Sequence, residues 1–186
     1  MKKDFKKIIP LRFQNSSYEN DVPQRIKDIT IKQIQDRAGL YIWGTPGTGK
    51  THMVCALTKF ILENGHDVRF YNTGDFLEKL REEFDGGFKN DDDYEGLFRE
   101  TMNFGGVLIF DDIGAEKATD WVRERLYLII NKKYEDMVPI IFTSNCDLEV
   151  LSARLGDRVG SRIRGMVYSL EKTGVDQRAE IANSTK

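Results

Sequence analysis

"GTPGTGKT", residues 44 to 51, is the stretch that decides the fold of this chain. It matches the pattern G-x-x-x-x-G-K-[ST] in full, after the apolar run "LYIW" and before a segment of helical periodicity. The glycines let the backbone curl so that its N–H groups point at phosphate oxygens, and the N-terminus of the following helix adds partial positive charge. The stretch therefore predicts a strand, a phosphate-binding loop and a helix, in that order.

The rest of the chain alternates between short β-branched or aromatic runs and longer segments of helical periodicity. The short runs predict five strands, at residues 40 to 44, 67 to 72, 106 to 112, 139 to 145 and 166 to 170. Helices are expected at residues 49 to 64, 75 to 84, 94 to 103, 119 to 135 and 147 to 156, and a loop at residues 86 to 93. Strands and helices in alternation imply parallel crossovers, so we expect an α/β three-layer sandwich around a parallel sheet.

Composition limits the class of protein. With 186 residues, of which 40% are apolar, the chain is long enough for one domain with its own core. A net charge of −2 argues against a protein that coats nucleic acid along its whole surface. Cys55 and Cys146 form no Cys-x-x-Cys pair, which disfavours a disulfide or zinc framework. No run approaches the ~20 apolar residues of a membrane span, so we expect a cytoplasmic protein without membrane contact.

The phosphate-binding loop identifies candidate nucleotide contacts. Lys50 is expected to bridge the β- and γ-phosphates of a nucleoside triphosphate, and the Thr51 hydroxyl to bind Mg²⁺. His52 follows in the first helical turn, where a histidine is more often a solvated or packing residue than a base. The expected contacts along this stretch are Gly44, Thr45, Pro46, Gly47, Thr48, Gly49, Lys50, Thr51 and His52.

Two adjacent carboxylates stand where the apolar strand in "VLIFDDIG", residues 107 to 114, runs out. Strand ends of an open α/β sheet form its ligand-binding edge. Asp111 suits Mg²⁺ coordination, and Asp112 can polarise a water for attack on the γ-phosphate. An acidic pair at a strand end can also be an ordinary helix cap, but the upstream phosphate-binding loop favours the catalytic interpretation.

The strand that ends in "FTSN" offers Asn145, whose side chain can hydrogen-bond the γ-phosphate or the attacking water. A simple turn or helix N-cap is the alternative. A guanine-reading Asn-Lys-x-Asp is not present, because "NKKY" at 131 to 134 ends in tyrosine, so ATP is favoured over GTP. A small-molecule kinase is disfavoured because no segment long enough for a substrate-covering lid follows the last strand.

A row of arginines follows, in "LSARLGDRVGSRIRGM", residues 151 to 166. Arg154, Arg158 and Arg162 recur every four residues, so a single helix would carry them on one face. Three stacked like charges repel one another, which indicates that they face an anion. A solvated basic face is the alternative, and contact of Arg154 or Arg164 with a nucleic-acid phosphate stays open.

Taken together, these motifs resemble the AAA+ ATPases, and within them the bacterial replicative helicase loaders of the DnaC/DnaI type and the related IstB transposition ATPases. The stretches that carry the resemblance are "IPLRFQNSSYEN", "GTPGTGKTHM", "LIFDDIGAEKATDWVRERLYLIINKKY", "FTSN", "RLGDRVGSRIRGM" and "TGVDQR". The resemblance implies the strand order 5-1-4-3-2 and a helical lid that is absent or minimal. By the same resemblance, Arg162 corresponds to the arginine finger, Arg158 to its neighbour and Arg178 to a sensor-2-like position.

The resemblance also implies a function. It predicts an ATPase with Mg²⁺ that forms homo-oligomers, in which the finger of one copy completes the site of the next, and that acts with a replicative DNA helicase. Single-stranded DNA is the implied polymer, with Lys79, Arg81, Phe84 or Phe88 as candidate contacts, although the acidic residues beside them fit an ordinary surface equally well. A transposition helper and a non-hydrolysing ATP-dependent scaffold remain alternatives. The expected organisation is an N-terminal segment at 1 to 38, an ATPase domain at 39 to 178 and a tail at 179 to 186.

Overall fold

A parallel five-stranded sheet forms the centre of the protein in a computed structural model, which describes residues 5 to 85 and 96 to 174. The strands are β1 Gly39–Trp43, β2 Val68–Asn72, β3 Val107–Asp111, β4 Ile140–Ser144 and β5 Val167–Glu171. Their order is β2-β3-β4-β1-β5, and all four pairings are parallel. Read from the other edge this is 5-1-4-3-2, so the predicted fold class is confirmed, and each predicted strand lies within one residue of its observed bounds.

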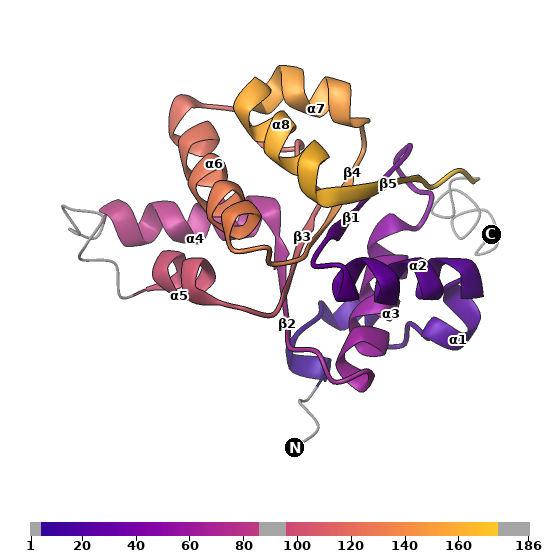
Figure 1. The fold of residues 1–186 in the computed structure, drawn as a ribbon. Coiled ribbons are helices and arrows are strands. Elements are labelled where there is room, and N and C mark those ends of the chain that lie inside the picture. Colours follow the sequence, from indigo (N-terminus) through magenta and orange to yellow (C-terminus); the bar gives the residue numbers. More distant parts are fainter. Residues whose placement is uncertain (1–4, 86–95, 175–186) are drawn as a thin grey trace, which may run out of the picture.

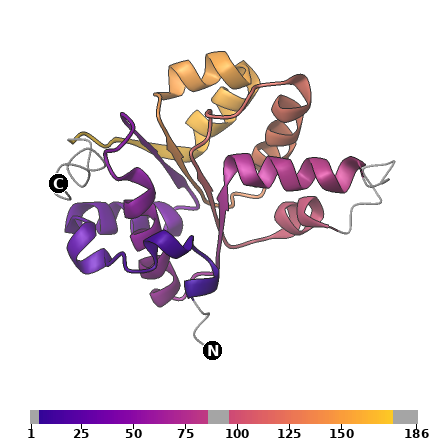
Figure 2. The same ribbon diagram turned by 180° about the vertical axis from the view of Figure 1, so that it is seen from behind.

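Helices cover both faces of the sheet (Figures 1 and 2). On one side lie α4 Thr73–Asp85, α5 Leu97–Asn103, α6 Asp120–Glu135, α7 Leu148–Leu155 and α8 Asp157–Met166. On the other lie α1 Tyr18–Asp21, α2 Gln24–Gln35 and α3 Lys50–Glu63, together with the 3-10 turns η1 Phe5–Lys7 and η2 Leu11–Phe13. The three layers bury two apolar clusters, one on each face of the sheet.

The strands supply both clusters because successive side chains point to opposite faces. Tyr41 and Phe142 face the cluster beneath α4, α6 and α8, whereas Leu40, Ile42 and Ile141 face the cluster beneath α3. A parallel strand covered on both faces reads as a continuous apolar run, which explains why β1, β3 and β4 were visible in the sequence. Among the described residues, none of the helices is both long enough and apolar enough to cross a bilayer.

The arginine row does not lie on one helix, so that prediction is wrong. Gly156, at φ 99° and ψ 149°, ends α7 and precedes α8. A positive φ suits glycine and interrupts the helical hydrogen-bond pattern, which places Arg154 on α7 but Arg158 and Arg162 on α8. The expected loop at 86 to 93, which contains Phe88, lies outside the described residues, and so does Arg178. The helix expected after this loop is α5, which begins at Leu97.

A buried lysine joins α6 to the end of α5. Lys133 is 1% exposed, and its Nζ donates to the carbonyls of Met102 at 2.8 Å and Phe104 at 2.7 Å. These carbonyls lie at the C-terminal end of α5, where a helix leaves acceptors without intrahelical partners. Burial lowers the pKa of Lys133 to about 8, because the ammonium loses hydration that the two carbonyls replace only in part.

The lowered pKa of Lys133 predicts a dependence of stability on pH. Because its pKa is about 8 in the folded chain and 10.5 for a lysine in water, protonation favours the unfolded state, so this contribution to stability is present above pH 10.5 and is lost as the pH falls through 8. We expect Lys133→Met to abolish this rise, of up to about 3 kcal/mol, in chemical denaturation measured across that range. Lys132→Met, which removes only the exposed pair with Asp136, should retain it. Equal pH profiles for Lys133→Met and the unmodified chain would contradict this assignment.

Candidate nucleotide site

The phosphate-binding loop connects β1 to α3 and is held by contacts within the loop. Gly47 and Gly49 have φ angles of 84° and 82°, which only glycine adopts without strain. Lys50 Nζ donates to the carbonyl oxygens of Gly44 at 2.8 Å and Thr45 at 2.9 Å, and the Thr48 hydroxyl donates to the Thr45 carbonyl at 2.9 Å. The side chain of Lys50 therefore lies along the inside of the loop, where phosphate oxygens bind in loops of this kind.

Asp111 ends β3 and lies beside Thr51 at the start of α3. The Thr51 hydroxyl is 3.1 Å from each carboxylate oxygen of Asp111, and the Thr143 hydroxyl of β4 donates to its Oδ1. Burial raises the pKa of the Asp111 carboxyl, although hydrogen bonds from Thr143 and Thr51 act against this shift. A hydroxyl beside a buried carboxylate is a donor set that fits Mg²⁺, and a bound cation would offset the cost of burying the charge.

Asp112 follows with a backbone conformation that is rare for a residue with a side chain. Its φ is +60°, and its N–H donates to the Thr143 hydroxyl at 2.8 Å. The Asn145 amide donates to Asp112 Oδ1 at 2.8 Å, while the Ile113 N–H donates to the Thr143 carbonyl at 2.9 Å. The end of β4 thus holds the Asp112 carboxylate in place despite the strained backbone, an arrangement common at functional sites.

These segments meet at one cavity of about 270 Å³ at the carboxyl ends of the strands. Its lining includes most of the residues expected to contact nucleotide or water, and also two residues of η2, Arg12 and Phe13. The other lining residues are Pro46, Gly47, Gly49, Lys50, Thr51, His52, Asp112, Thr143 and Asn145. The cavity therefore combines phosphate-binding N–H groups, a lysine, and a carboxylate held by an amide. This combination fits a nucleoside triphosphate and a water that attacks it.

His52 lies at this cavity but has a partner of its own. Its Nε2 is 2.8 Å from Asp21 Oδ2 on α1, and its ring meets that of Phe13 edge to face at 6.2 Å. The pair links the N-terminal segment to the first turn of α3. This arrangement is that of a packing residue beside the nucleotide loop, while its ring remains part of the cavity wall.

The three arginines of the predicted row lie outside the cavity of their own chain. Arg158 donates to the Tyr127 hydroxyl at 2.8 Å and Arg162 donates through Nε to Asn131 Oδ1 at 2.8 Å, so both lie against α6. The Arg162 guanidinium also lies 4.8 Å from the centre of the Tyr134 ring. Arg154 donates to the Gly114 carbonyl at 2.8 Å. None of the three arginines lines the nucleotide cavity.

Sequence reasoning missed three residues of the cavity. Thr143 connects Asp111 to Asp112, and its signal was a polar residue near the end of a buried strand that begins with an apolar run. Arg12 and Phe13 stand in "IPLRFQNSSYEN", a stretch that carries the resemblance, but no site role was assigned to them, because they reach the cavity only through the packing of the N-terminal segment. Another buried carboxyl lies close by: Glu116 accepts from the Gly114 N–H at 2.9 Å, and burial raises its pKa.

Comparison with known proteins gives the family. A model of the IstB-like ATP binding protein family matches residues 6–162. Among curated relatives, the replicative helicase loader DnaC of Buchnera aphidicola is 24% identical over 156 residues, which are 82% of this chain and 62% of the relative. The phage-like element PBSX protein XkdC of Bacillus subtilis is 29% identical over 160 residues, 77% of this chain and 57% of the relative.

Solved structures agree with the fold. A crystal structure of the DnaC helicase loader superposes with a TM-score of 0.72 at 27% identity and covers 88% of this chain and 100% of that one. The replication initiator DnaA, in a structure with AMPPCP and single-stranded DNA, gives a TM-score of 0.70 at 20% identity over 92% of this chain and 54% of its own, which shows the fold alone.

The chain spans about half to three fifths of the length of the curated relatives that it matches. The family model, by contrast, extends over most of the chain and includes the phosphate-binding loop, the acidic pair, and Arg158 and Arg162 of α8. This chain belongs to the family of IstB-like ATP-binding proteins.

Proposed function

We propose that the chain is an ATPase that assembles into oligomers and acts as a helicase loader in DNA replication. The observation that carries the catalytic part is the position of Asp112. Its carboxylate lies in one cavity with Lys50 and Thr51 and accepts from the Asn145 amide, while its backbone N–H donates to the Thr143 hydroxyl. A phosphate-binding loop without such a carboxylate would support binding alone, whereas this arrangement supports hydrolysis as well.

In the proposed reaction the loop N–H groups and Lys50 Nζ bind the β- and γ-phosphate oxygens of ATP. Thr51 and Asp111 hold Mg²⁺, which supplies charge neutralisation at the phosphates when it is bound. Asp112 accepts a proton from the attacking water, and Asn145, which already donates to Asp112 Oδ1, orients that water. The water oxygen bonds to the γ-phosphorus as the bond to the bridging oxygen breaks, and ADP leaves with that electron pair.

Replacing Asp112 tests hydrolysis separately from binding. We expect Asp112→Asn to keep ATP affinity and to lower steady-state hydrolysis by about 10² to 10⁴, the range for loss of a general base. Glu116→Gln is a matched control, because it neutralises another buried carboxyl in the same loop and should retain most of the activity. Hydrolysis by Asp112→Asn at the normal rate would remove Asp112 from the mechanism, whereas ATP binding without hydrolysis by the unmodified chain would favour an ATP-dependent scaffold.

The positions of the arginines support a site shared between copies. Arg158 and Arg162 occupy successive turns of α8 and are held against Tyr127, Asn131 and Tyr134 of α6, away from the cavity of their own chain. Their guanidinium groups therefore need another anion, and the γ-phosphate of a neighbouring copy fits the chemistry of an arginine finger. Arg162 serves as that finger and Arg158 as its neighbour, so ATP hydrolysis depends on assembly.

The proposed client is a replicative helicase, because two curated relatives whose matches extend over most of this chain are described as replicative helicase loaders. We expect the tagged full chain to recover a replicative helicase from its source cell in the presence of ATP, and Lys50→Ala to recover less. The DnaA neighbour supports single-stranded DNA as the polymer. Recovery of a transposase in place of the helicase would favour a transposition helper, a candidate that the IstB-like family model supports.

A further inference from the structure

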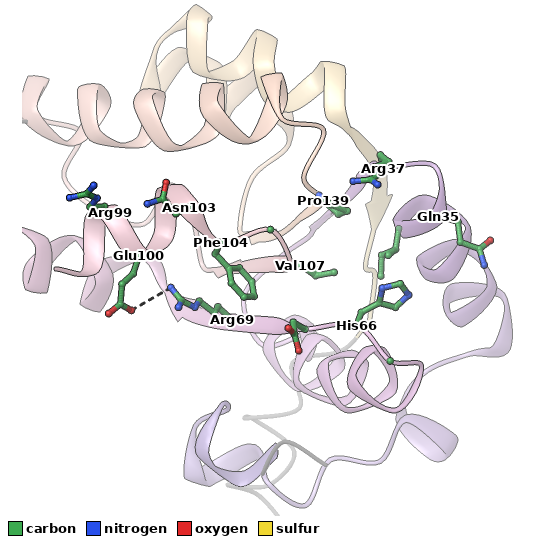
Figure 3. Close-up of a pocket in the computed structure, with 15 residues that line it drawn as sticks. Gln35, Arg37, His66, Arg69, Arg99, Glu100, Asn103, Phe104, Val107 and Pro139 are labelled. Atoms are coloured by element: carbon green, nitrogen blue, oxygen red, sulfur yellow. Dashed lines mark ion pairs between the residues drawn. The ribbon is translucent and has the colours of Figure 1, made fainter. Parts of the chain in front are cut away.

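A second large groove lies at the edge of the sheet opposite the nucleotide cavity (Figure 3). We name it the amino-edge groove. Its volume is about 960 Å³, and its walls are the end of α2, the turn before β2, helix α5, the connection from α5 to β3, and Pro139 before β4. Because the strands are parallel, residues that precede β2, β3 and β4 gather at one edge, while the nucleotide residues that follow β1, β3 and β4 gather at the other.

Arginines occupy both ends of the amino-edge groove. Figure 3 shows Arg99 at one end, Arg37 at the other and Arg69 between them. Arg69 is engaged within the chain, because its guanidinium is 3.5 Å from Glu100 and 4.6 Å from the centre of the Phe104 ring. Arg37 and Arg99 are exposed, and within the described part of the chain neither has a carboxylate at ion-pair distance. Both are therefore available to an anion from outside.

Arg37 is held in this position at a conformational cost. Its φ is +58°, in the left-handed region where glycine or asparagine is the usual residue after a helix. The hydrogen bonds from the N–H of Arg37 to the Ile34 carbonyl and from the N–H of Ala38 to the Gln33 carbonyl close the end of α2 around it. An arginine at a left-handed position is less favourable than glycine, because its Cβ crowds the following carbonyl oxygen. The backbone thus directs a guanidinium into the groove where local stability would favour a smaller residue.

Part of the wall between the two ends is bare backbone, at Gly105 and Gly106. A Cβ added to Gly105 would meet nothing within 4 Å, whereas one added to Gly106 would lie 2.5 Å from the Asp67 carbonyl. Within the described residues, the N–H groups of Gly105 and Gly106 donate no hydrogen bond. Two consecutive free N–H groups, with no side chain above Gly105, form a surface on which another backbone can lie closely.

Charge and ring geometry decide between two kinds of anionic ligand. Asp67 and Glu100 also line the groove and would repel a phosphate backbone with a charge at every nucleotide. The Phe104 ring, which a base would need for stacking, is covered by Arg69. A protein segment avoids both problems, because its carboxylates can be spaced by neutral residues and can bind guanidinium groups in the bidentate geometry that arginine favours.

We propose that the amino-edge groove docks an acidic, extended segment of a partner protein. Arg37 and Arg99 each bind a carboxylate, one near either end of the segment, and the N–H groups of Gly105 and Gly106 donate to its backbone carbonyls. The docking site lies apart from the nucleotide cavity and does not depend on ATP hydrolysis, so this assignment stands or falls separately from the proposed ATPase mechanism.

A peptide titration with the full chain tests this site. The probe is a fluorescent peptide, acetyl-Glu-Glu-Val-Leu-Val-Glu-Glu-amide, with its all-Gln counterpart and a labelled oligothymidylate as comparisons. We expect the acidic peptide to bind, the all-Gln peptide to fail, and the backbone N–H resonances of Gly105 and Gly106 to shift on titration. Binding should weaken as ionic strength rises, because the arginines are exposed.

Variants connect the binding to the two arginines. Arg37→Asn with Arg99→Gln should weaken the acidic peptide by about tenfold, the loss expected for two exposed charge pairs, and asparagine keeps the left-handed backbone accessible. Arg25→Gln removes an exposed cation from the same helix, α2, outside the groove and should change the affinity little. Equal affinity for the double variant, or no binding of the acidic peptide, overturns the proposal. Arginine-dependent binding of the oligothymidylate alone also overturns it, in favour of nucleic acid.

Discussion

Lys50→Ala should lower ATP affinity by roughly a hundredfold or more. Lys50 is 7% exposed and its ammonium lies inside the phosphate-binding loop, so its hydrogen bonds to phosphate oxygens form where water competes poorly. A hydrogen bond to a charged group contributes about 1.5 to 3 kcal/mol, and Lys50 is expected to make one to each of two phosphates. Titration with a fluorescent ATP analogue measures the loss directly.

The control for this variant is on the same helix. Lys59→Ala removes a cation from α3 that lies 5.9 Å from the centre of the Tyr18 ring, far along the helix from the loop, and should leave nucleotide affinity unchanged. Because Lys50 also donates to the Gly44 and Thr45 carbonyls, thermal unfolding of Lys50→Ala must be compared with that of the unmodified chain. Normal ATP affinity in a folded Lys50→Ala chain would contradict the assignment of this loop to phosphate binding.

Arg162→Ala should bind ATP normally and lose most of its hydrolysis. An arginine finger supplied by another chain accelerates phosphoryl transfer by about 10³ to 10⁵, which corresponds to roughly 4 to 7 kcal/mol of transition-state stabilisation. Arg162 lies against Asn131 and Tyr134 and does not line the cavity of its own chain, so its removal leaves the binding residues intact. Steady-state hydrolysis at saturating ATP, together with an independent affinity measurement, separates the two effects.

Mixing two inactive variants tests whether the site is shared. A Lys50→Ala chain retains Arg162, and an Arg162→Ala chain retains its nucleotide cavity, so a mixed assembly contains some complete sites. We expect the mixture to recover activity that neither variant has alone. For the unmodified chain, we expect the rate of hydrolysis per molecule to rise with protein concentration. Arg164→Ala, on the exposed surface of α8, is the control and should hydrolyse ATP normally. Absence of rescue in mixtures that do assemble would exclude Arg162 as a finger in trans.

The nucleotide loop shows how far local pattern reaches. Gly47, Gly49, Lys50 and Thr51 are consecutive or nearly so, and their geometry follows from glycine φ angles and the start of a helix. Strands β1, β3 and β4 were equally predictable, because each is an apolar run buried on both faces of the sheet. The edge strands β2 and β5 are less buried, and their β-branched and aromatic residues indicated them. Both features depend on the residues within one short stretch of the chain.

The arginine row shows where local pattern fails. A spacing of four residues predicted one charged helix face, but Gly156 ends α7 between Arg154 and Arg158. A regular spacing of arginines does not reveal a turn between two helices that pack against each other. The helix break, in turn, directs Arg154 to the Gly114 carbonyl and the other two arginines to α6.

The sequence alone determined the phosphate-binding loop, the alternation of strands and helices, and the family resemblance, because each depends on residues that are neighbours along the chain. Only the tertiary structure connected Thr143 to both acidic residues, brought Arg12 and Phe13 to the nucleotide cavity, and joined α2, α5 and the strand starts into the amino-edge groove. Those contacts join segments far apart in sequence. They depend on how the helices pack on the sheet, because packing fits the shapes of side chains from distant parts of the chain. Such contacts leave no local pattern in the sequence.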